Sequence, residues 1–458
     1  MTILKNKNII LSILLIAVMF LILITFFLEI SSLERVLLPF FIFLFINLGI
    51  FVLLNKICKD KFVAKIYLIS LLLHLIFILF WNIFKYHLLG YCLPTENVFK
   101  PFTIDNDGAL YHSYGVYISQ HFMQKTLTTH FTGGLYPKIV GCMYHYFGIN
   151  PFIVCLFNLN IGSLVAPIIY LIGKHVFREI EIAKLYSFLS ILTFAHIMNT
   201  SIMIRDAYIT LFMYLSIFLS FIFYKSKNIF YLILTLISLY TLYSFRPYAS
   251  FVIFFAIVAS LIVSKYNFQF KQGVVKSNIY SLVLTILSPI VICIILFLLY
   301  LVFSSLNLLS VEDLIEVREI SYQYGDAQIA FDFGALYSKF FLLPFIIGYI
   351  YLFGAPFPWE WVKPSRIVYV PDMFFLYCFL SSFFKNIKFV LTSKNYLLLI
   401  SLFSIIFMFS IYCITLGNSG AIHRLRGPFI PMIYLIAMSK PDKFLSQILN
   451  KIQKWRLL

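Results

Sequence analysis

Long apolar runs recur from one end of the 458-residue chain to the other, and most are about as long as the hydrocarbon core of a bilayer requires. In lipid, every backbone N–H and C=O group has to be hydrogen-bonded within its own segment, so such spans form helices. A transmembrane β-barrel would show short strands of alternating polarity instead. We predict about 12 transmembrane helices, at residues 9–28, 36–55, 65–84, 151–173, 184–203, 207–224, 229–245, 248–264, 279–303, 368–384, 396–415 and 427–439.

The composition supports the same fold class. Only 12% of the residues are charged and 62% are hydrophobic, whereas a water-soluble domain carries roughly 25% charged residues. We therefore expect an all-α polytopic membrane protein. The net charge of +17 does not indicate a nucleic-acid partner, because the Lys and Arg residues lie in short clusters between the spans.

These basic clusters predict the orientation of the chain. Lys5 and Lys7 place the N-terminus in the cytoplasm, and alternation of the spans then makes the other basic stretches cytoplasmic too, in agreement with the positive-inside rule. The acidic residues concentrate in the opposite, extracytoplasmic stretches. We expect a multi-pass protein of a bacterial inner membrane, surrounded by membrane lipids, with both termini in the cytoplasm. The basic stretches begin at Lys56, Lys174, Lys225, Lys265, Lys385 and Lys440.

The domain organisation follows from the spans. Residues 1–64 would hold two N-terminal transmembrane helices, residues 65–440 one transmembrane catalytic domain, and residues 441–458 a basic cytoplasmic tail. Two extracytoplasmic loops are long, 85–150 and 304–367. In the first, the pieces 108–123 and 135–148 are moderately apolar and predict interfacial helices. In the second, the piece 340–353 predicts an interfacial or re-entrant segment.

The first outer loop carries a pair of carboxylates, Asp105 and Asp107, just before a predicted helix on which Tyr111, Tyr114 and Tyr117 recur at helical spacing. A carboxylate near a helix N-terminus is stabilised in its ionised form by the helix dipole. It could deprotonate an acceptor hydroxyl or bind a divalent cation such as Mg²⁺ or Mn²⁺. The alternative is structural, because Asp105 could simply cap the helix. We expect Tyr111 to contact substrate.

Three further outer corners carry charges. Arg205 and Asp206 interrupt an apolar stretch, and Arg246 precedes Pro247 in another hairpin. A tight turn with an internal ion pair is the structural alternative for the first of them. The last outer loop holds His423, Arg424 and Arg426, against the positive-inside trend. Arginine presents a planar fork that grips phosphate oxygens, so Arg205, Arg246 and this last group are candidate substrate contacts.

Together the four corners predict a site on the extracytoplasmic face that binds a lipid-linked phosphate. Arginines would hold the phosphate leaving group, and a carboxylate would activate the acceptor hydroxyl.

The residues that build these corners also resemble a known family. The acidic "DNDGALYH" is followed by "GLYPKIVGCMYHYFGINPFIVCLFNLNIGSLVAPIIYLIGKHVF", the "RDA" corner, the "RPY" hairpin, the "FGAPFPW" loop and the closing "RLRGPFIPMIYL". In this order they resemble the GT-C superfamily of membrane glycosyltransferases, in particular its bacterial members akin to protein mannosyltransferases and aminoarabinose transferases.

The resemblance implies a GT-C-like fold that transfers a sugar from a polyprenyl-phosphate donor to an extracytoplasmic glycan or lipid acceptor, in the synthesis or modification of bacterial surface glycans. It implies that the first-loop aspartate is the catalytic base, or acts with a metal ion where one is used. That role falls on Asp107, with Asp105 second, and Asp206 matches a second acidic position. Arg246, Arg424 and Arg426 would contact phosphate. Two extra spans precede the matching region and the soluble C-terminal domain of some relatives is missing, so the acceptor stays open.

Two other functions stay open at this stage. O-antigen or capsular polysaccharide polymerases also have about a dozen spans and essential outer arginines, by analogy of fold, and the loop 304–367 fits them. A flippase or transporter for a lipid-linked glycan would show an internal repeat and charges near mid-membrane, and the sequence shows neither.

Overall fold

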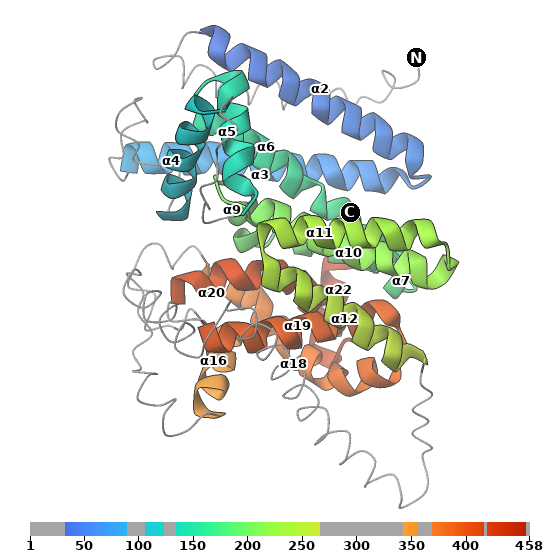
Figure 1. The fold of residues 1–458 in the computed structure, drawn as a ribbon. Helices are drawn as coiled ribbons and strands as arrows, with labels where there is room; N and C mark the ends of the chain where they lie inside the picture. Colours follow the sequence, from blue (N-terminus) through green and yellow to red (C-terminus); the bar gives the residue numbers. More distant parts are fainter. Residues whose placement is uncertain are drawn as a thin grey trace, which may run out of the picture. The chain divides into compact units, whose positions relative to one another are not determined.

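The computed structural model describes residues 33–88, 106–122, 134–265, 342–355, 357, 369–415 and 419–454 (Figure 1). Over these ranges the chain forms helices and connecting turns, with no strand. The chain divides into two compact units, Met1–Ile253 with Ile452–Leu458, and Phe254–Lys451. The two boundaries fall inside helices, Pro247–Lys265 and Lys443–Lys454. The predicted division into 1–64, 65–440 and 441–458 stays a prediction.

The described part of the first unit is built from eleven helices, the last of which crosses the boundary. They are α2 (Leu33–Ile57), α3 (Lys61–Leu88), α4 (Asn106–Gln120), α5 (Tyr136–Phe147), α6 (Pro151–Ser163), α7 (Val165–Val176), α8 (Ile180–Ile191), α9 (Phe194–Ser201), α10 (Asp206–Ser226), α11 (Ile229–Phe245) and α12 (Pro247–Lys265).

The described part of the second unit holds shorter and more interrupted helices. They are α16 (Leu342–Gly354), α18 (Val370–Thr392), α19 (Tyr396–Thr415), α20 (Ser419–Arg426), the 3-10 turn η3 (Gly427–Phe429), α21 (Ile430–Ser439) and α22 (Lys443–Lys454).

Among the described residues, six helical segments are long and apolar enough to cross a membrane, and the protein is a multi-pass membrane protein. A seventh is possible if α8 and α9, which are bent by 58° at Leu192 and Thr193, form one broken span. The six are Lys61–Ile78, Pro151–Val176, Asp206–Ser226, Pro247–Ser264, Val370–Thr392 and Tyr396–Cys413.

The all-helical class is therefore confirmed for the described residues, but the predicted count of about 12 spans is not confirmed. The predicted spans 9–28 and 279–303 lie outside the described residues. Phe41–Ile57 and Ile229–Phe245 are apolar but shorter than a full span. The predicted last span is split between η3 and α21, because prolines at 428 and 431 each start a new helical segment.

The two expected helices of the first outer loop are confirmed as α4 and α5, which pack against each other. Their place at the membrane interface stays a prediction. In the second outer loop, α16 covers the expected piece at 340–353 and is 13 residues long. A helix of that length extends about 20 Å, less than the hydrocarbon core of a bilayer.

Local sequence explains where several of these helices begin. Asn150 caps α6 by accepting a hydrogen bond from the N–H of Phe152 at 3.0 Å, and Pro151 fills the first helical position. Asn228 caps α11 in the same way through the N–H of Phe230, at 2.9 Å.

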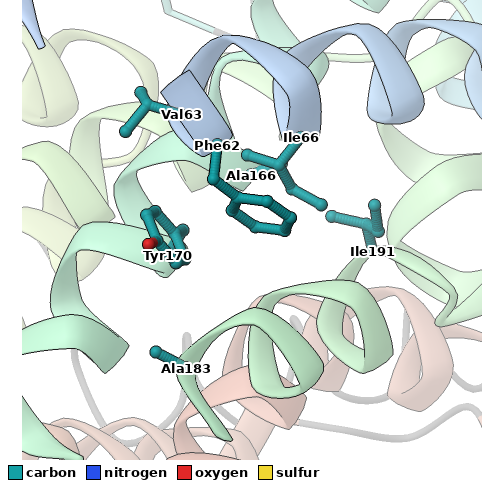
Figure 2. Packing of buried hydrophobic residues seen from close by; sticks show 7 residues of the cluster. All are labelled: Phe62, Val63, Ile66, Ala166, Tyr170, Ala183 and Ile191. Atoms are coloured by element: carbon teal, nitrogen blue, oxygen red, sulfur yellow. The ribbon is translucent and has the colours of Figure 1, made fainter. Parts of the chain in front are cut away.

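One hydrophobic cluster of the first unit packs α3 against α7 and α8. Its members come from all three helices, and the ring of Phe62 lies among them (Figure 2). The rings of Phe62 and Tyr170 are 4.7 Å apart. The cluster fixes the ends of these three apolar helices relative to one another. It consists of Phe62, Val63, Ile66, Ala166, Tyr170, Ala183 and Ile191.

Candidate active site

Asp206 and Arg246 form a buried ion pair in the first unit. Asp206 is the first residue of α10, and Arg246 lies between α11 and α12. The Arg246 Nη2 atom lies 3.2 Å from Asp206 Oδ1, and the two side chains are only 5% and 1% exposed. Burying two charges is costly unless they compensate each other, so this pair ties the start of α10 to the corner between α11 and α12.

Arg205 contacts the same corner. Its Nη1 donates a hydrogen bond to the carbonyl oxygen of Phe245, at 2.9 Å, and its side chain is half-buried. A turn with an internal ion pair was the structural alternative for Arg205 and Asp206. The ion pair exists, but Asp206 makes it with Arg246, 40 residues further along the chain.

The turn before α10 is held by a buried amide. Asn158, on α6, donates from Nδ2 to the carbonyl oxygens of Ile202, at 2.6 Å, and Ile204, at 3.0 Å. The same nitrogen lies 2.9 Å from the hydroxyl of Tyr136. Because the turn is not helical, its carbonyl groups need a partner from elsewhere, and Asn158 provides it. Asn158 thus fixes the backbone of the turn that leads into Arg205 and Asp206.

The hairpin of α4 and α5 is anchored at this corner. The N–H of Leu135 donates to the carbonyl oxygen of Ser244 at 2.9 Å, in the last turn of α11. Gly134 adopts a φ of +66°, and a Cβ atom there would lie 2.2 Å from the same Ser244 oxygen. Only glycine allows both this backbone conformation and this close approach.

A line of aromatic rings runs from α4 to the corner. The ring centroids of Tyr111 and Tyr136 are 5.0 Å apart, those of Tyr136 and Tyr208 are 5.8 Å apart, and those of Tyr208 and Phe245 are 4.9 Å apart. Asp107 lies in the first turn of α4, one helical turn before Tyr111, and is half-buried. Residues four apart share a helix face, so Asp107 lies on the face of α4 from which this line starts.

His112, beside Tyr111, carries no positive charge at neutral pH. Burial lowers the pKa of His112 to about 4. Its Nδ1 lies 2.8 Å from the hydroxyl of Tyr144, whose own pKa burial raises well above its ordinary value. This pair is therefore a neutral hydrogen bond between α4 and α5, unsuited to neutralising a phosphate.

In the second unit, Arg426 supports the polypeptide backbone. Its Nη1 donates to the carbonyl oxygens of Leu352 and Ala355, both at 2.9 Å, at the end of α16. Its Nη2 lies 3.2 Å from His423 Nδ1 and 2.9 Å from Met373 Sδ. The side chain is 1% exposed. These contacts give Arg426 the role of a cap on the C-terminal end of α16.

The neighbours of Arg426 are also largely enclosed. The ring of His423 stacks on Tyr369, with centroids 4.5 Å apart and 16° between the planes. Arg424 is half-buried. Asp372, in the first turn of α18, is 2% exposed and acts electrostatically on Arg426. The substrate contacts predicted for His423, Arg424 and Arg426 stay predictions.

Three of the predicted residues, Arg205, Asp206 and Arg246, thus lie at one corner of the first unit. Tyr111 is linked to that corner through the rings of Tyr136, Tyr208 and Phe245, and Asp107 lies one helical turn before Tyr111. Sequence reasoning missed Asn158 and Asp372. Both could have been found as polar residues within predicted spans, in "CLFNLN" and "VPDMFF".

A metal site is not built from the described residues. Within the ranges that the structure describes, no group of three His, Cys, Asp or Glu side chains could hold an ion. Asp105, one of the two predicted ligands, lies outside those ranges. The expectation that Asp105 and Asp107 bind Mg²⁺ or Mn²⁺ stays a prediction.

Comparison with known proteins shows a family similarity over part of the chain. No curated protein and no solved structure matched it. Residues 134–311 match the family model described as dolichyl-phosphate-mannose-protein mannosyltransferase. The match covers fewer than half of the 458 residues and includes α5 to α12, hence Asn158 and the Asp206–Arg246 pair. Over residues 134–311 the chain is therefore similar to the dolichyl-phosphate-mannose-protein mannosyltransferases, a GT-C family, which confirms the predicted resemblance and suggests a membrane glycosyltransferase with a lipid-linked sugar donor.

Proposed function

We propose that the protein transfers a sugar from a polyprenyl-phosphate donor to an extracytoplasmic glycan or lipid acceptor, in bacterial surface-glycan synthesis or modification. One observation carries the proposal. The α4–α5 hairpin with Asp107 is anchored to the corner that holds Arg205, Asp206 and Arg246. The family match over residues 134–311 supports a transferase over a polymerase or a flippase.

Asp107 is the better candidate for the catalytic base. It is half-buried at the start of α4, so an acceptor can reach it. Asp206 is 1% exposed and paired with Arg246. A nearby guanidinium stabilises the ionised form of a carboxylate and so weakens it as a base. We therefore assign Asp206 as a positioning residue that holds Arg246.

Arg205 and Arg246 are the proposed partners of the donor phosphate. Both guanidinium groups are held at the same corner before substrate binds, but the charge of Arg246 is compensated by Asp206, so the half-buried Arg205 is the first proposed partner. Fixed charges stabilise a developing negative charge without the cost of reorganisation.

In the proposed step, Asp107 takes the proton of the acceptor hydroxyl. The acceptor oxygen forms a bond to the anomeric carbon of the sugar, and the bond from that carbon to the phosphate oxygen breaks. The electron pair of the broken bond stays on the polyprenyl phosphate, which gains one negative charge. The arginines stabilise that charge as the phosphate leaves.

The test is sugar transfer by the purified full-length protein in lipid nanodiscs, with a radiolabelled polyprenyl-phosphate sugar and a lipid-linked glycan acceptor. We expect Asp107→Asn to lower kcat roughly 10²–10⁴-fold, the usual contribution of a general base, with little change in KM. Asp107→Glu should restore part of the activity, because it restores the carboxylate.

Ser113→Ala is the matched control, since Ser113 is an exposed residue on the same helix and donates to the carbonyl of Ala109. Full activity of Asp107→Asn would contradict the assignment of the base. Donor-dependent movement of intact glycan across the membrane, without sugar transfer, would replace the proposal with a flippase. A ladder of products that grows by whole repeat units would replace it with a polymerase.

A further inference from the structure

The first unit has a lysine-rich pocket outside the candidate active site. The pocket has a volume of about 720 Å³ and lies where α3 begins, α7 ends and α8 begins. It is lined by Lys59, Asp60, Lys61, Phe62, Lys65, Lys174, Ile180 and Lys184. Five ammonium groups therefore face one carboxylate.

That carboxylate cannot neutralise the lysines as a group. Asp60 Oδ2 accepts from Lys174 Nζ and from the Tyr170 hydroxyl, both at 2.7 Å, and Oδ1 accepts from the N–H of Phe62 at 3.0 Å. Partial burial raises the pKa of the Asp60 carboxyl, but these hydrogen bonds outweigh it and leave the pKa below its ordinary value. Asp60 is thus already paired with Lys174 and hydrogen-bonded to the N-terminus of α3.

The remaining lysines surround an apolar floor. The Nζ atoms of Lys65 and Lys184 lie 5.8 and 5.5 Å from the ring centroid of Phe62, which belongs to the cluster in Figure 2. Lys184 also pairs with Glu181 at 2.7 Å, whereas Lys61 and Lys65 are exposed. Ile180 lines the pocket with 52% of its surface exposed. The pocket therefore offers positive charge next to accessible apolar surface.

The pocket also lies at the ends of two candidate spans, where a membrane interface is expected. The span Lys61–Ile78 starts in its wall, and the span Pro151–Val176 ends two residues after Lys174. Lysines at the ends of spans are common and often only face water. Here they come from three helices and line one open, shallow pocket. Basic pockets between transmembrane helices suit anionic lipid head groups.

From this arrangement we propose that the lysine pocket binds the phosphate of an anionic phospholipid, with the start of its acyl chains against the exposed side chain of Ile180. Free inorganic phosphate shares the charge but would not use this apolar surface. The charge of the pocket places it on the predicted cytoplasmic side, away from the predicted site of sugar transfer.

The test is native mass spectrometry of the full-length protein from micelles that contain equal amounts of phosphatidylglycerol and phosphatidylcholine. We expect retained phosphatidylglycerol on the wild type and an apparent affinity lowered roughly tenfold or more in the double variant Lys61→Gln/Lys65→Gln. The matched control is Lys225→Gln/Lys388→Gln, which removes the same charge at exposed lysines outside the pocket. The control should keep nearly all of the binding.

Three results would overturn the proposal. Equal losses of affinity for phosphatidylglycerol in the two double variants would show that binding depends on the net charge of the protein and not on the pocket. Equal retention of the two lipids by the wild type would show that the protein does not prefer the anionic phosphatidylglycerol to the zwitterionic phosphatidylcholine. Displacement of phosphatidylglycerol by inorganic phosphate at a similar concentration would identify a site for free phosphate. A circular-dichroism melting curve for each variant shows whether it is folded, and Lys65→Arg, which keeps the charge, should bind like the wild type.

Discussion

The two units each bury an arginine beside a proline-initiated helical segment, yet the two arginines have different partners. Arg246 lies before Pro247 and pairs with the Asp206 carboxylate. Arg426 lies two residues before Pro428 and donates to the carbonyl oxygens of Leu352 and Ala355. A similar sequence context thus leads to an ion pair in one unit and a helix cap in the other. A buried arginine in a predicted outer loop is therefore not by itself a phosphate ligand, and its partners decide its role.

The ion pair of the first unit should respond most strongly to truncation. Asp206→Ala leaves Arg246 buried without its carboxylate, which we expect to cost about 3–5 kcal/mol in unfolding free energy. Arg246→Ala should cost a similar amount, and the double variant much less than the sum. The measurement is a double-mutant cycle from reversible unfolding in mixed micelles.

The control for that cycle is the exposed pair Lys184–Glu181, where Glu181→Ala should cost about 0–1 kcal/mol. If Asp206→Ala costs no more than Glu181→Ala, the buried pair does not hold the corner together, and the contrast between the two units disappears.

Gly134 tests a second difference between the two units. The corner of the first unit also anchors the α4–α5 hairpin, through the residues next to Gly134. Gly134→Ala places a Cβ atom 2.2 Å from the Ser244 carbonyl oxygen at a φ of +66°, so the hairpin has to shift. A displacement of about 1 Å at a catalytic group can lower the rate roughly 10²-fold, and we expect a loss of sugar transfer of that order.

Gly148→Ala is the matched control for Gly134→Ala. Gly148 also has a positive φ, +83°, but a Cβ atom there meets nothing within 4 Å. Equal losses of activity in the two variants would mean that backbone strain, rather than the position of α4, explains the effect.

Arg426→Lys tests the cap of the second unit. An ammonium group cannot reproduce the fork that donates to two carbonyl oxygens and also reaches His423 Nδ1, so we expect a loss of about 1.5–3 kcal/mol in unfolding free energy. Arg424→Lys, at the half-buried neighbour, is the control and should cost less. A smaller loss for Arg426→Lys than for Arg424→Lys would contradict the capping role.

The sequence predicted the class of fold, whereas the contacts of the candidate site residues in the two units could not be predicted from it. Apolar length predicts spans because bilayer thickness sets the length of a span, and the positive-inside bias predicts only orientation. The motif "RDA" predicted a charged corner, but its ion-pair partner is 40 residues away and depends on packing between α10 and α11. Arg426 was predicted as a phosphate contact, and its contacts with the end of α16 depend on a segment more than 70 residues earlier.

The smallest expected effect is on the pH dependence of stability, and it concerns the two histidine–tyrosine contacts. His112 Nδ1 meets the Tyr144 hydroxyl at 2.8 Å, whereas His423 stacks on Tyr369. Because burial lowers the pKa of His112 from 6.5 to about 4, the unfolded chain binds a proton in this interval that the folded chain does not. Stability should therefore fall as the pH falls from about 6.5 towards 4, and His112 should make no pH-dependent contribution above that interval.

His112→Gln, which can still hydrogen-bond to Tyr144, should make melting temperatures between pH 7 and pH 5 less dependent on pH than in the wild type. An unchanged pH dependence in that variant would show that His112 binds a proton as readily in the folded protein as in the unfolded chain. The contact between α4 and α5 would then not require the neutral form of His112.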